Sequence, residues 1–476
     1  MAEQHSLQES GRRDAPAQGT ARSPPTLDGL PVLDHTLSLL RGGVEFGDSV
    51  AAHGDVVRFD AMGMPFVAVY DPELVQQVLV DRNDEFRKGD YETSLGELVA
   101  PRGLAFTEGE QWRRDRQLLQ PAFTPRHVQS FADTMVARTA SAADDWAAEG
   151  TVDLRESASA LTLDILVGTL FDIDLDAERG QVVREAMSAL ADRISGASTM
   201  VPEWLPTPAK RRFDRRMAAL DEMVEALVRE RRAGDGPGSR DDLLDTLLAA
   251  EYPDGSTMDA EHVRDQLVTF LMAGHETTAV ALTYILWLLA GDSTVRDRLD
   301  AEIATVCGGS DPTFADLPAL EVAEAVVNEA LRLYPPVYAI YRQPVADTVL
   351  GGYELQEDQT LILGTYQIHR DDRWWDDPER FRPERWLDAG GGEDEDGEDE
   401  NGEAADAEDR PEYAYFPFGG GPRHCIGMRF ARMELQLALV TLARRLDFER
   451  VTETVEPSAK VTLDPGTVRL RVRDRR

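Results

Sequence analysis

The chain has 476 residues, and its 88 acidic residues against 50 basic ones give a formal net charge of −38. This charge excludes nucleic acid and anionic membrane surfaces as general partners, because their phosphates would be repelled. The chain has only two cysteines, Cys307 and Cys425, which excludes a disulfide-rich scaffold and predicts a cytoplasmic protein.

The N-terminal part is polar and then β-rich. Residues 1–26 lack an apolar core of seven or more residues, so they predict a disordered leader and no secretory signal. Residues 27–70 contain short β-like stretches between Gly, Pro and Asp turn signals. Helical periodicity follows, and the expected helices are Pro72–Leu79, Gly109–Leu119, Pro125–Ala148, Leu154–Phe171, Ala177–Ile194, Pro208–Arg232, Asp241–Ala249, Asp259–Ala290 and Ser293–Val306.

The C-terminal part returns to short strands, expected at Val345–Leu350 and Thr360–Leu363. Residues 389–412 are rich in Gly, Asp and Glu and predict a solvated acidic insertion, because such a segment can neither bury apolar area nor tolerate its own repulsion. The longest apolar run, Ala279–Ala290, is too short for a membrane span of roughly 20 residues. We therefore expect residues 27–476 to form one mainly α domain with small β-sheets and no transmembrane segment.

The composition also indicates the salt concentration in which the protein works. Lysine occurs only at Lys88, Lys210 and Lys460, and every other basic residue is arginine. Strong acidity with scarce lysine resembles the proteins of salt-accumulating halophiles, in which salt screens the repulsion between surface carboxylates. A mesophilic protein with acidic tails is the alternative, but the acid excess is spread along the whole chain.

Two groups of candidate polar residues lie on expected helices. Trp112 and Arg116 are four residues apart, so an indole N–H and a guanidinium share one helical face and could hold a carboxylate. Further along, Gly274-His275-Glu276-Thr277-Thr278 interrupts an apolar helix. The glycine and the threonines allow a local opening that could hold a bound molecule or water, and a polar stripe satisfied by its neighbours is the alternative.

Glu329 and Arg332 are three residues apart on an apolar helix that ends at Pro335. A surface ion pair is the ordinary interpretation of this spacing. With Arg385 as a third partner, the pair would instead form a buried network that locks this helix to the chain before Cys425.

Cys425 follows a glycine-rich loop, Phe418-Gly419-Gly420-Gly421-Pro422-Arg423-His424, and precedes an amphipathic helix expected to begin at or just after the cysteine. A helix N-terminus favours the thiolate, and the glycines let the backbone approach a flat, bulky group. Haem ligated by a cysteine thiolate fits this pattern, and a buried, inert cysteine is the alternative.

Together these elements resemble the cytochrome P-450 superfamily of haem-thiolate monooxygenases, from about Leu27 to the C-terminus. The F-x-x-G-x-x-x-C-x-G motif is matched at Phe418, Gly421, Cys425 and Gly427. The A-G-x-E-T and E-x-x-R strings support it. The stretch from His369 to Trp386 is similar to that of fatty-acid-hydroxylating members.

The resemblance implies a cytochrome P-450 fold that binds haem b. It implies that Cys425 is the axial iron ligand and that Glu276 and Thr277 relay protons. The residues implied to hold the haem are Trp112, Arg116, Arg342, Phe418, Arg423 and Gly427.

The implied function is oxygen insertion into an apolar small molecule, a fatty acid, lipid or terpenoid, with dioxygen and electrons from a separate ferredoxin and its reductase. The alternatives are a peroxide-using peroxygenase, an isomerase, or a gas or redox sensor on the same haem-thiolate site. The candidate pocket segments are Phe86–Phe106, Ile194–Pro208, Leu271–Thr277 and Val337–Tyr341.

Overall fold

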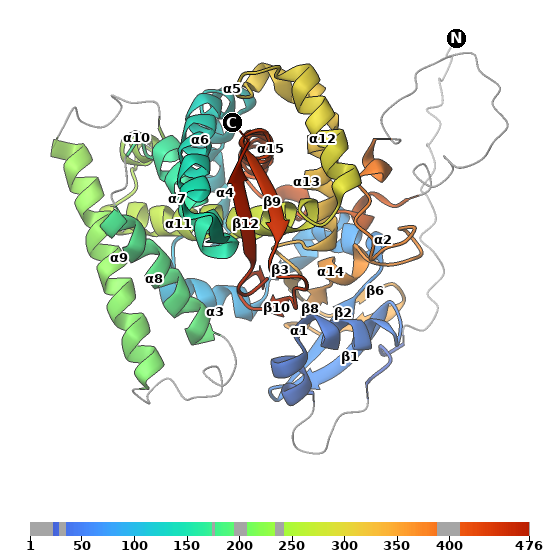
Figure 1. Ribbon diagram of the computed structural model, residues 1–476. Coiled ribbons are helices and arrows are strands. Elements are labelled where there is room, and N and C mark those ends of the chain that lie inside the picture. The colour runs from blue at the N-terminus through green and yellow to red at the C-terminus, as the bar shows by residue number, and fades with distance from the viewer. Residues whose placement is uncertain are drawn as a thin grey trace, which may run out of the picture.

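Helices build most of the molecule, and the largest sheet lies at one side of it (Figure 1). The computed structural model describes residues 22–27, 35–173, 177–194, 207–233, 242–387 and 410–475. The helices are α1 (Thr36–Ala51), α2 (Pro72–Gln76), α3 (Asp90–Val99), α4 (Gly109–Leu119), α5 (Pro125–Gln129), α6 (Ala132–Glu149), α7 (Leu154–Leu170), α8 (Ala177–Ile194), α9 (Pro208–Ala233), α10 (Leu243–Ala249), α11 (Ala260–Leu289), α12 (Ser293–Val306), α13 (Glu321–Leu333), α14 (Thr365–Ile368) and α15 (Met428–Arg445).

The described strands form one five-stranded sheet and three smaller ones. The larger sheet has the order β1-β2-β8-β5-β3, in which only the β2–β8 pair is parallel. The order of the three-stranded sheet is β4-β12-β9, and β6–β7 and β10–β11 are hairpin-like pairs. The strands are β1 (Val56–Ala61), β2 (Met64–Val69), β3 (Phe86–Lys88), β4 (Thr151–Asp153), β5 (Ile340–Pro344), β6 (Thr348–Leu350), β7 (Tyr353–Leu355), β8 (Thr360–Leu363), β9 (Leu446–Arg450), β10 (Ser458–Ala459), β11 (Leu463–Asp464) and β12 (Arg469–Asp474).

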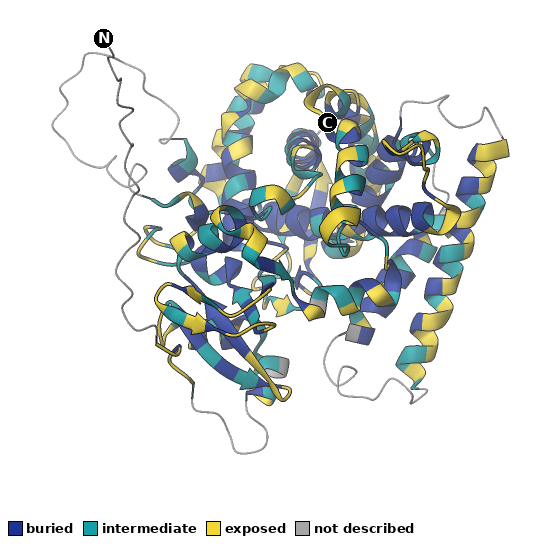
Figure 2. Cartoon of the chain, turned by 180° about the vertical axis from the view of Figure 1, so that it is seen from behind, coloured by how far each residue is buried: buried dark blue, intermediate teal, exposed yellow. Residues whose placement is uncertain are grey.

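Burial concentrates in the middle of the molecule. The main core joins residues of α6, α7, α11, α13 and α15, and a second core packs on the five-stranded sheet. Figure 2 shows this pattern as a dark-blue centre, with yellow on the outward faces of the peripheral helices. The long helix α11 is buried along most of its length, which agrees with its apolar sequence.

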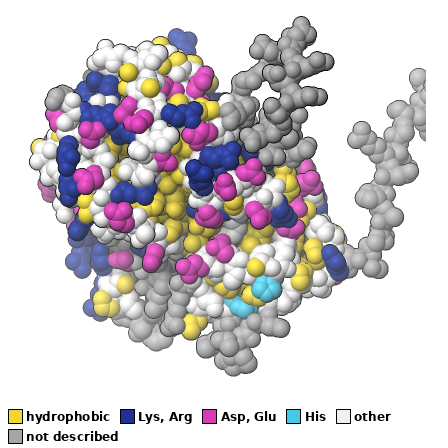
Figure 3. Space-filling model, turned by 45° about the vertical axis from the view of Figure 1, so that its right-hand side comes forward, with side chains coloured by type: hydrophobic (Ala, Val, Ile, Leu, Met, Phe, Trp, Pro, Cys, Tyr) yellow, Lys and Arg dark blue, Asp and Glu magenta, His cyan; other side chains and the backbone are white. Residues whose placement is uncertain are grey.

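Arginine and carboxylate side chains pair across the surface. Figure 3 shows basic and acidic groups interspersed over one face, with hydrophobic groups visible between them. Examples are Arg373 with Asp55 at 2.7 Å and Arg471 with Glu449 at 2.7 Å. Such exposed pairs each contribute little, on the order of 0–1 kcal/mol.

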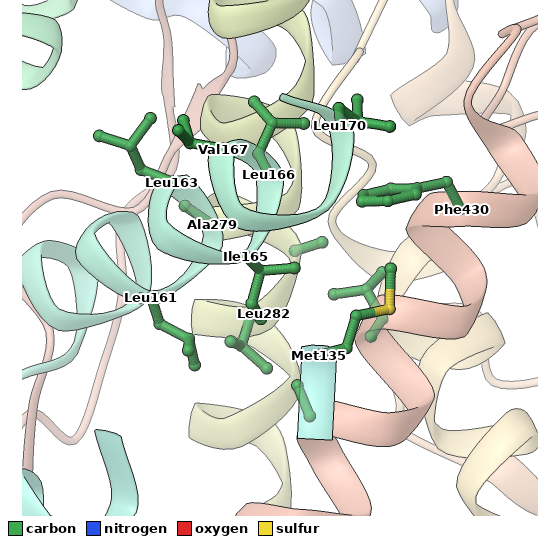
Figure 4. Packing of buried hydrophobic residues seen from close by; sticks show 14 of the residues in the cluster. Met135, Leu161, Leu163, Ile165, Leu166, Val167, Leu170, Ala279, Leu282 and Phe430 are labelled. Atoms are coloured by element: carbon green, nitrogen blue, oxygen red, sulfur yellow. The ribbon is translucent and has the colours of Figure 1, made fainter. Parts of the chain in front are cut away.

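Close packing of α7 on α11 sets one wall of the site. Figure 4 shows Ile165 of α7 beside Leu282 of α11, and Leu170 of α7 on the side of Phe430 of α15. A Cβ at Gly274 would lie 2.7 Å from Leu166 Cδ1, so a larger residue there would force the Leu166 side chain to move. Gly274, the first residue of the polar interruption in α11, therefore has a packing role.

The N-terminal region is more ordered and more helical than expected. Within the stretch predicted to be β-rich, Thr36–Ala51 forms α1, bent at Gly43, whose φ of 47° and ψ of −115° are not helical. The three glycines in this stretch, Gly42, Gly43 and Gly47, hide the helical period. Residues 22–26, placed in the disordered leader, pair instead: Arg22 bridges to Tyr353 and Thr26 to Arg58.

Two other boundaries also differ. The helix expected at Pro125–Ala148 is two helices, α5 and α6, separated at Ser130 and Phe131. The strand expected at Val345–Leu350 is wrong in its first half, since β5 ends at Pro344 and Val345 is exposed. Most of the candidate pocket segment 194–208 and of the acidic insertion 389–412 lies outside the described residues.

No single described helix has both the length and the apolar content of a membrane span. Helices α11 and α12 meet that test only when taken together, and they are bent by 106° relative to each other.

Candidate active site

The loop before α15 turns the Cys425 side chain toward a cavity. The Cys425 N–H donates to Phe418 O at 2.9 Å, and positive φ angles at Gly419 and Gly421 shape the turn. A Cβ at Gly421 would lie 1.9 Å from Leu79 O, so the loop can pack against that backbone only with glycine. Helix α15 begins at Met428, three residues after the cysteine.

The cavity has a volume of about 340 Å³ and lies between α11 and the Cys425 loop. Ala273 and Thr277 line it from α11, and Phe418 and Cys425 line it from the loop. Gly427 also lines it, and a Cβ there would meet only Phe123, at 3.9 Å. The missing side chain at Gly427 therefore leaves open space inside the cavity.

The electrostatic surroundings of the Cys425 thiol act in two directions. The surrounding protein raises the pKa of Cys425, whereas the Gly427 N–H and the charge of Arg116 act to lower it. Cys307, the other cysteine, ends α12 and does not line the cavity. The structure thus brings only one of the two cysteines to the cavity.

Four cationic side chains gather at one end of the cavity. The predicted residues Arg116, Arg342 and Arg423 lie there, and so does Lys88, which sequence reasoning missed. Lys88 faces Arg342 in the β3–β5 register, a pairing between segments more than 250 residues apart. Its only signal in the sequence is that lysine is rare in this chain.

Two carboxylates lie among these four cations. Glu92 is 3.5 Å from Lys88 and 3.7 Å from Arg342, and Glu108 is 2.8 Å from Arg423. Burial lowers the pKa of Lys88, and it lowers the pKa of Arg423 to about 10 although Glu108 opposes the shift. The cluster therefore keeps an excess of positive charge beside the cavity.

Trp112 and Arg116 both face this end, as their spacing predicts. The Arg423 guanidinium lies 4.3 Å from the Trp112 ring centre, which packs one expected cofactor-binding residue on another. Arg116 donates to His424 O at 3.1 Å and lies 3.1 Å from His424 Nε2. Phe418 lines the same cavity.

Glu329, Arg332 and Arg385 meet in one buried network. Glu329 accepts hydrogen bonds from Arg332 at 2.8 and 2.9 Å and from Arg385 at 3.1 Å, and the Glu329 and Arg332 side chains are fully buried. Burial acts to raise the pKa of Glu329, but the hydrogen bonds and charges of the two arginines hold it below its usual value.

His369 extends this network to the Cys425 loop. Its carbonyl accepts from Arg332 at 2.7 Å, and its Nε2 accepts from the Phe416 N–H at 2.9 Å. Burial and the charge of Arg332 lower the pKa of His369 to about 3. The imidazole is therefore neutral, and its Nε2 accepts a hydrogen bond from the backbone two residues before Phe418.

Glu276 and Thr277, predicted to act at one site, face two different cavities. Thr277 lines the cavity of Cys425 and donates to Ala273 O at 2.6 Å. Glu276 forms an ion pair with Arg155 and lines a second, polar cavity of about 960 Å³. Consecutive helical residues point about 100° apart, which separates the two side chains.

Other charged groups line the second cavity. Arg155 lies 3.6 Å from Asp464, and Asp464 forms an ion pair with Lys460. His275 is fully buried at its edge, with Nε2 4.0 Å from Glu276. Sequence reasoning missed Arg155 and Asp464, because nothing local links α7 and β11 to α11.

Comparison with known proteins decides the family. A model of the cytochrome P-450 family matches residues 24–471. The chain belongs to the cytochrome P-450 family. Among its relatives, cyclooctat-9-en-7-ol 5-monooxygenase of Streptomyces melanosporofaciens is 35% identical, over 87% of each chain. Pentalenene oxygenase of Streptomyces avermitilis is 33% identical, over 91% of each chain.

A solved structure shares the fold. The retinoic acid-bound cyanobacterial CYP120A1 superposes with a TM-score of 0.83 at 25% identity, over 96% of this chain and all of that one. Family membership makes the chain a haem-dependent monooxygenase that uses dioxygen and receives electrons from a redox partner. The fold expected from the sequence, mainly α with small sheets, is confirmed.

The residues at the cavity fit a haem. A thiol faces the cavity from one wall, and the open space at Gly427 suits a flat group close to the backbone. Four cations with two carboxylates leave two positive charges beside the cavity, and haem carries two propionates. Charge and shape therefore both agree with the cofactor of the family.

Proposed function

We propose that this cytochrome P-450 hydroxylates an apolar terpenoid in the cytoplasm of a halophilic organism. The observation that carries the proposal is the cavity of Cys425, whose walls away from the cationic end are lined by Leu, Phe, Ala, Val and Ile side chains and by threonines. The named activities of the cyclooctat-9-en-7-ol and pentalenene relatives support the terpenoid class over the fatty acids.

In this proposal the Cys425 thiolate would hold the iron of haem b, and bound haem would supply the activation of dioxygen. Arg116, Arg342, Arg423 and Lys88 hold the propionates by charge, while Trp112 packs on Arg423. Phe418 and Gly427 would contact the haem ring, since both line the cavity and Gly427 has no side chain to block it. Glu329, Arg332 and Arg385 hold the loop that presents the cysteine.

Thr277 keeps a hydroxyl at the oxygen side of the cavity, and Glu276 takes up protons in the polar cavity behind it. A carboxylate bound to Arg155 has to change its rotamer to reach the Thr277 side of α11. A threonine in the cavity supports dioxygen chemistry over a peroxygenase, which has less need of a proton relay. Electrons come from a separate ferredoxin and its reductase.

The axial assignment is tested by paired cysteine variants. Cys425→Ser should abolish the thiolate-type red shift of the reduced carbon monoxide complex, because serine offers no thiolate to iron. Cys307→Ser is the control and should leave that spectrum unchanged. The opposite pattern would refute the assignment of Cys425.

A further inference from the structure

We propose that the substrate of this enzyme is neutral, a terpenoid hydrocarbon or alcohol, and that carboxylic acids are rejected. This inference rests on the proposed function and adds the charge of the substrate to it. Fatty acids and terpenoid acids share the apolar chain of such substrates. The side chains that line the described part of the cavity separate these classes.

The charged groups that line the described part of the cavity lie at one end. Lys88, Arg342 and Arg423 are joined there through Glu92 and Glu108. Arg116 belongs to the same end, since it binds His424, the neighbour of Arg423. The two positive charges left over match the two propionates of haem, so no cation of this cluster stays free for a substrate acid.

The hydroxyl groups that line the described part of the cavity are also committed as donors. Thr269, Thr277 and Thr278 all lie on α11, and each donates to the carbonyl four residues before it, at 2.7, 2.6 and 2.8 Å respectively. In this arrangement each hydroxyl proton is directed at a backbone carbonyl, and each oxygen can accept a hydrogen bond from a ligand. The cavity wall on α11 therefore offers acceptors to a substrate, and its hydroxyl donors are already engaged.

Most of the remaining lining groups are hydrocarbon, and the Trp112 indole lies with Arg423 at the cationic end. The hydrocarbon groups come from the segment before α4, from α7, from α11 and from the chain between α13 and β5, and include Leu104, Leu166, Phe270, Ala273, Val337 and Ile340. A carboxylate placed among these groups loses its hydration and gains no donor, which is costly. An alcohol loses less, because its O–H can donate to a threonine oxygen.

The fold by itself does not decide this selectivity. CYP120A1, whose structure holds retinoic acid, superposes closely on this chain. A carboxylate ligand is thus compatible with the architecture, and the discrimination must come from the side chains of the cavity. That makes the charge of the ligand testable without any change of fold.

The experiment is a spectral titration of the haem-loaded full chain with matched ligands. The ligands are the hydrocarbon, alcohol and acid of 10-, 15- and 20-carbon isoprenoid skeletons, and the fatty alcohol and fatty acid of similar lengths. We expect the acid of each skeleton to bind at least about 100-fold more weakly than the alcohol, the size expected for one unpaired buried charge. Equal or tighter binding of the acids overturns the inference.

A gain-of-function variant makes the test independent of chain length. Val337 lines the cavity and is 41% exposed, so an arginine there can be accommodated. Val337→Arg should raise the affinity for the acids at least about 10-fold, since it supplies the missing donor, and should leave the hydrocarbons weaker or unchanged. Val337→Leu is the control and should not favour the acids. If Val337→Arg binds acids no better than wild type, the lack of a donor is not what excludes them.

The outcomes separate the two proposals. Binding of neutral fatty alcohols without any terpenoid would refute the terpenoid function and keep the inference about charge. Binding of terpenoid acids in preference to alcohols would keep the terpenoid function and refute the inference. If only fatty acids bind, both are wrong.

Discussion

At the scale of single residues, Glu276 and Thr277 show how much one step along a helix matters. The two residues are adjacent in the sequence, yet the threonine lines the Cys425 cavity and the carboxylate lines the polar cavity behind α11. The Glu276 side chain is held there by Arg155. Under the proposed function, proton supply and oxygen contact would therefore belong to different faces of one helix.

Thr277→Ala should uncouple the reaction. Loss of the hydroxyl removes a hydrogen-bonding group of α11 that faces the Cys425 cavity, so electrons should be consumed while product per electron falls several-fold and peroxide appears. The measurement is the ratio of product to electron donor oxidised, with Thr278→Val as a matched control on the same helix. A Thr277→Ala enzyme that stays coupled with a tightly bound substrate would remove Thr277 from the relay.

At the scale of elements, the network around Glu329 connects α13 to the loop that carries Cys425. Arg332 contacts His369 O, and His369 Nε2 accepts from Phe416, two residues before Phe418. The connection needs a neutral imidazole, because a protonated ring would offer no acceptor to the Phe416 N–H. Local protonation is thus coupled to the geometry of the cysteine loop.

The pKa of His369 predicts an acid-dependent loss of stability. The folded pKa, about 3, lies below the ordinary value of 6.5, so the stabilising contribution is complete above pH 6.5 and falls as the pH drops toward 3. By pH 5 the loss is about 2 kcal/mol.

Urea unfolding at pH 7 and pH 5 measures this loss. His369→Gln keeps an acceptor for the Phe416 N–H but does not titrate, so we expect it to lose less stability between the two pH values than wild type. His53→Gln, at an exposed position, is the control and should behave as wild type does. Equal pH dependence in wild type and His369→Gln would contradict the prediction.

How much could be predicted from the sequence depends on how far apart the interacting residues lie along the chain. The Cys425 loop and the Glu329 and Arg332 pair are local patterns, and the structure shows them in one region with Arg385. Lys88 and Arg155 reach their sites only through tertiary contacts, so no spacing reveals them. The different directions of Glu276 and Thr277 were open to prediction from helical geometry alone.

At the scale of the whole molecule, the net charge of −38 is carried by a surface on which many arginines are already paired. The uncompensated carboxylates repel one another at low salt, where screening extends over roughly 10 Å or more. At molar salt the screening length is about 3 Å. The same sequence is therefore expected to be more stable in concentrated salt.

Thermal unfolding in increasing potassium chloride tests this expectation. The unfolding temperature should rise by several degrees between 0.05 and 2 M salt, because self-repulsion is screened before the buried pairs are affected. Sucrose at matched osmolality separates screening from general exclusion effects. An unfolding temperature that is constant or falls with salt would contradict the proposal of a halophilic protein.

Helix α11 has one further consequence for how the enzyme is supplied. The helix, about 10 Å across, separates the apolar cavity of Cys425 on one side from the polar cavity on the other. The polar cavity is lined by Lys460, whose side chain is 41% exposed, so water can reach it without passing through the apolar cavity. Under the proposed function, a substrate could therefore fill the apolar cavity tightly while Glu276 stays accessible to protons from the other side of the helix.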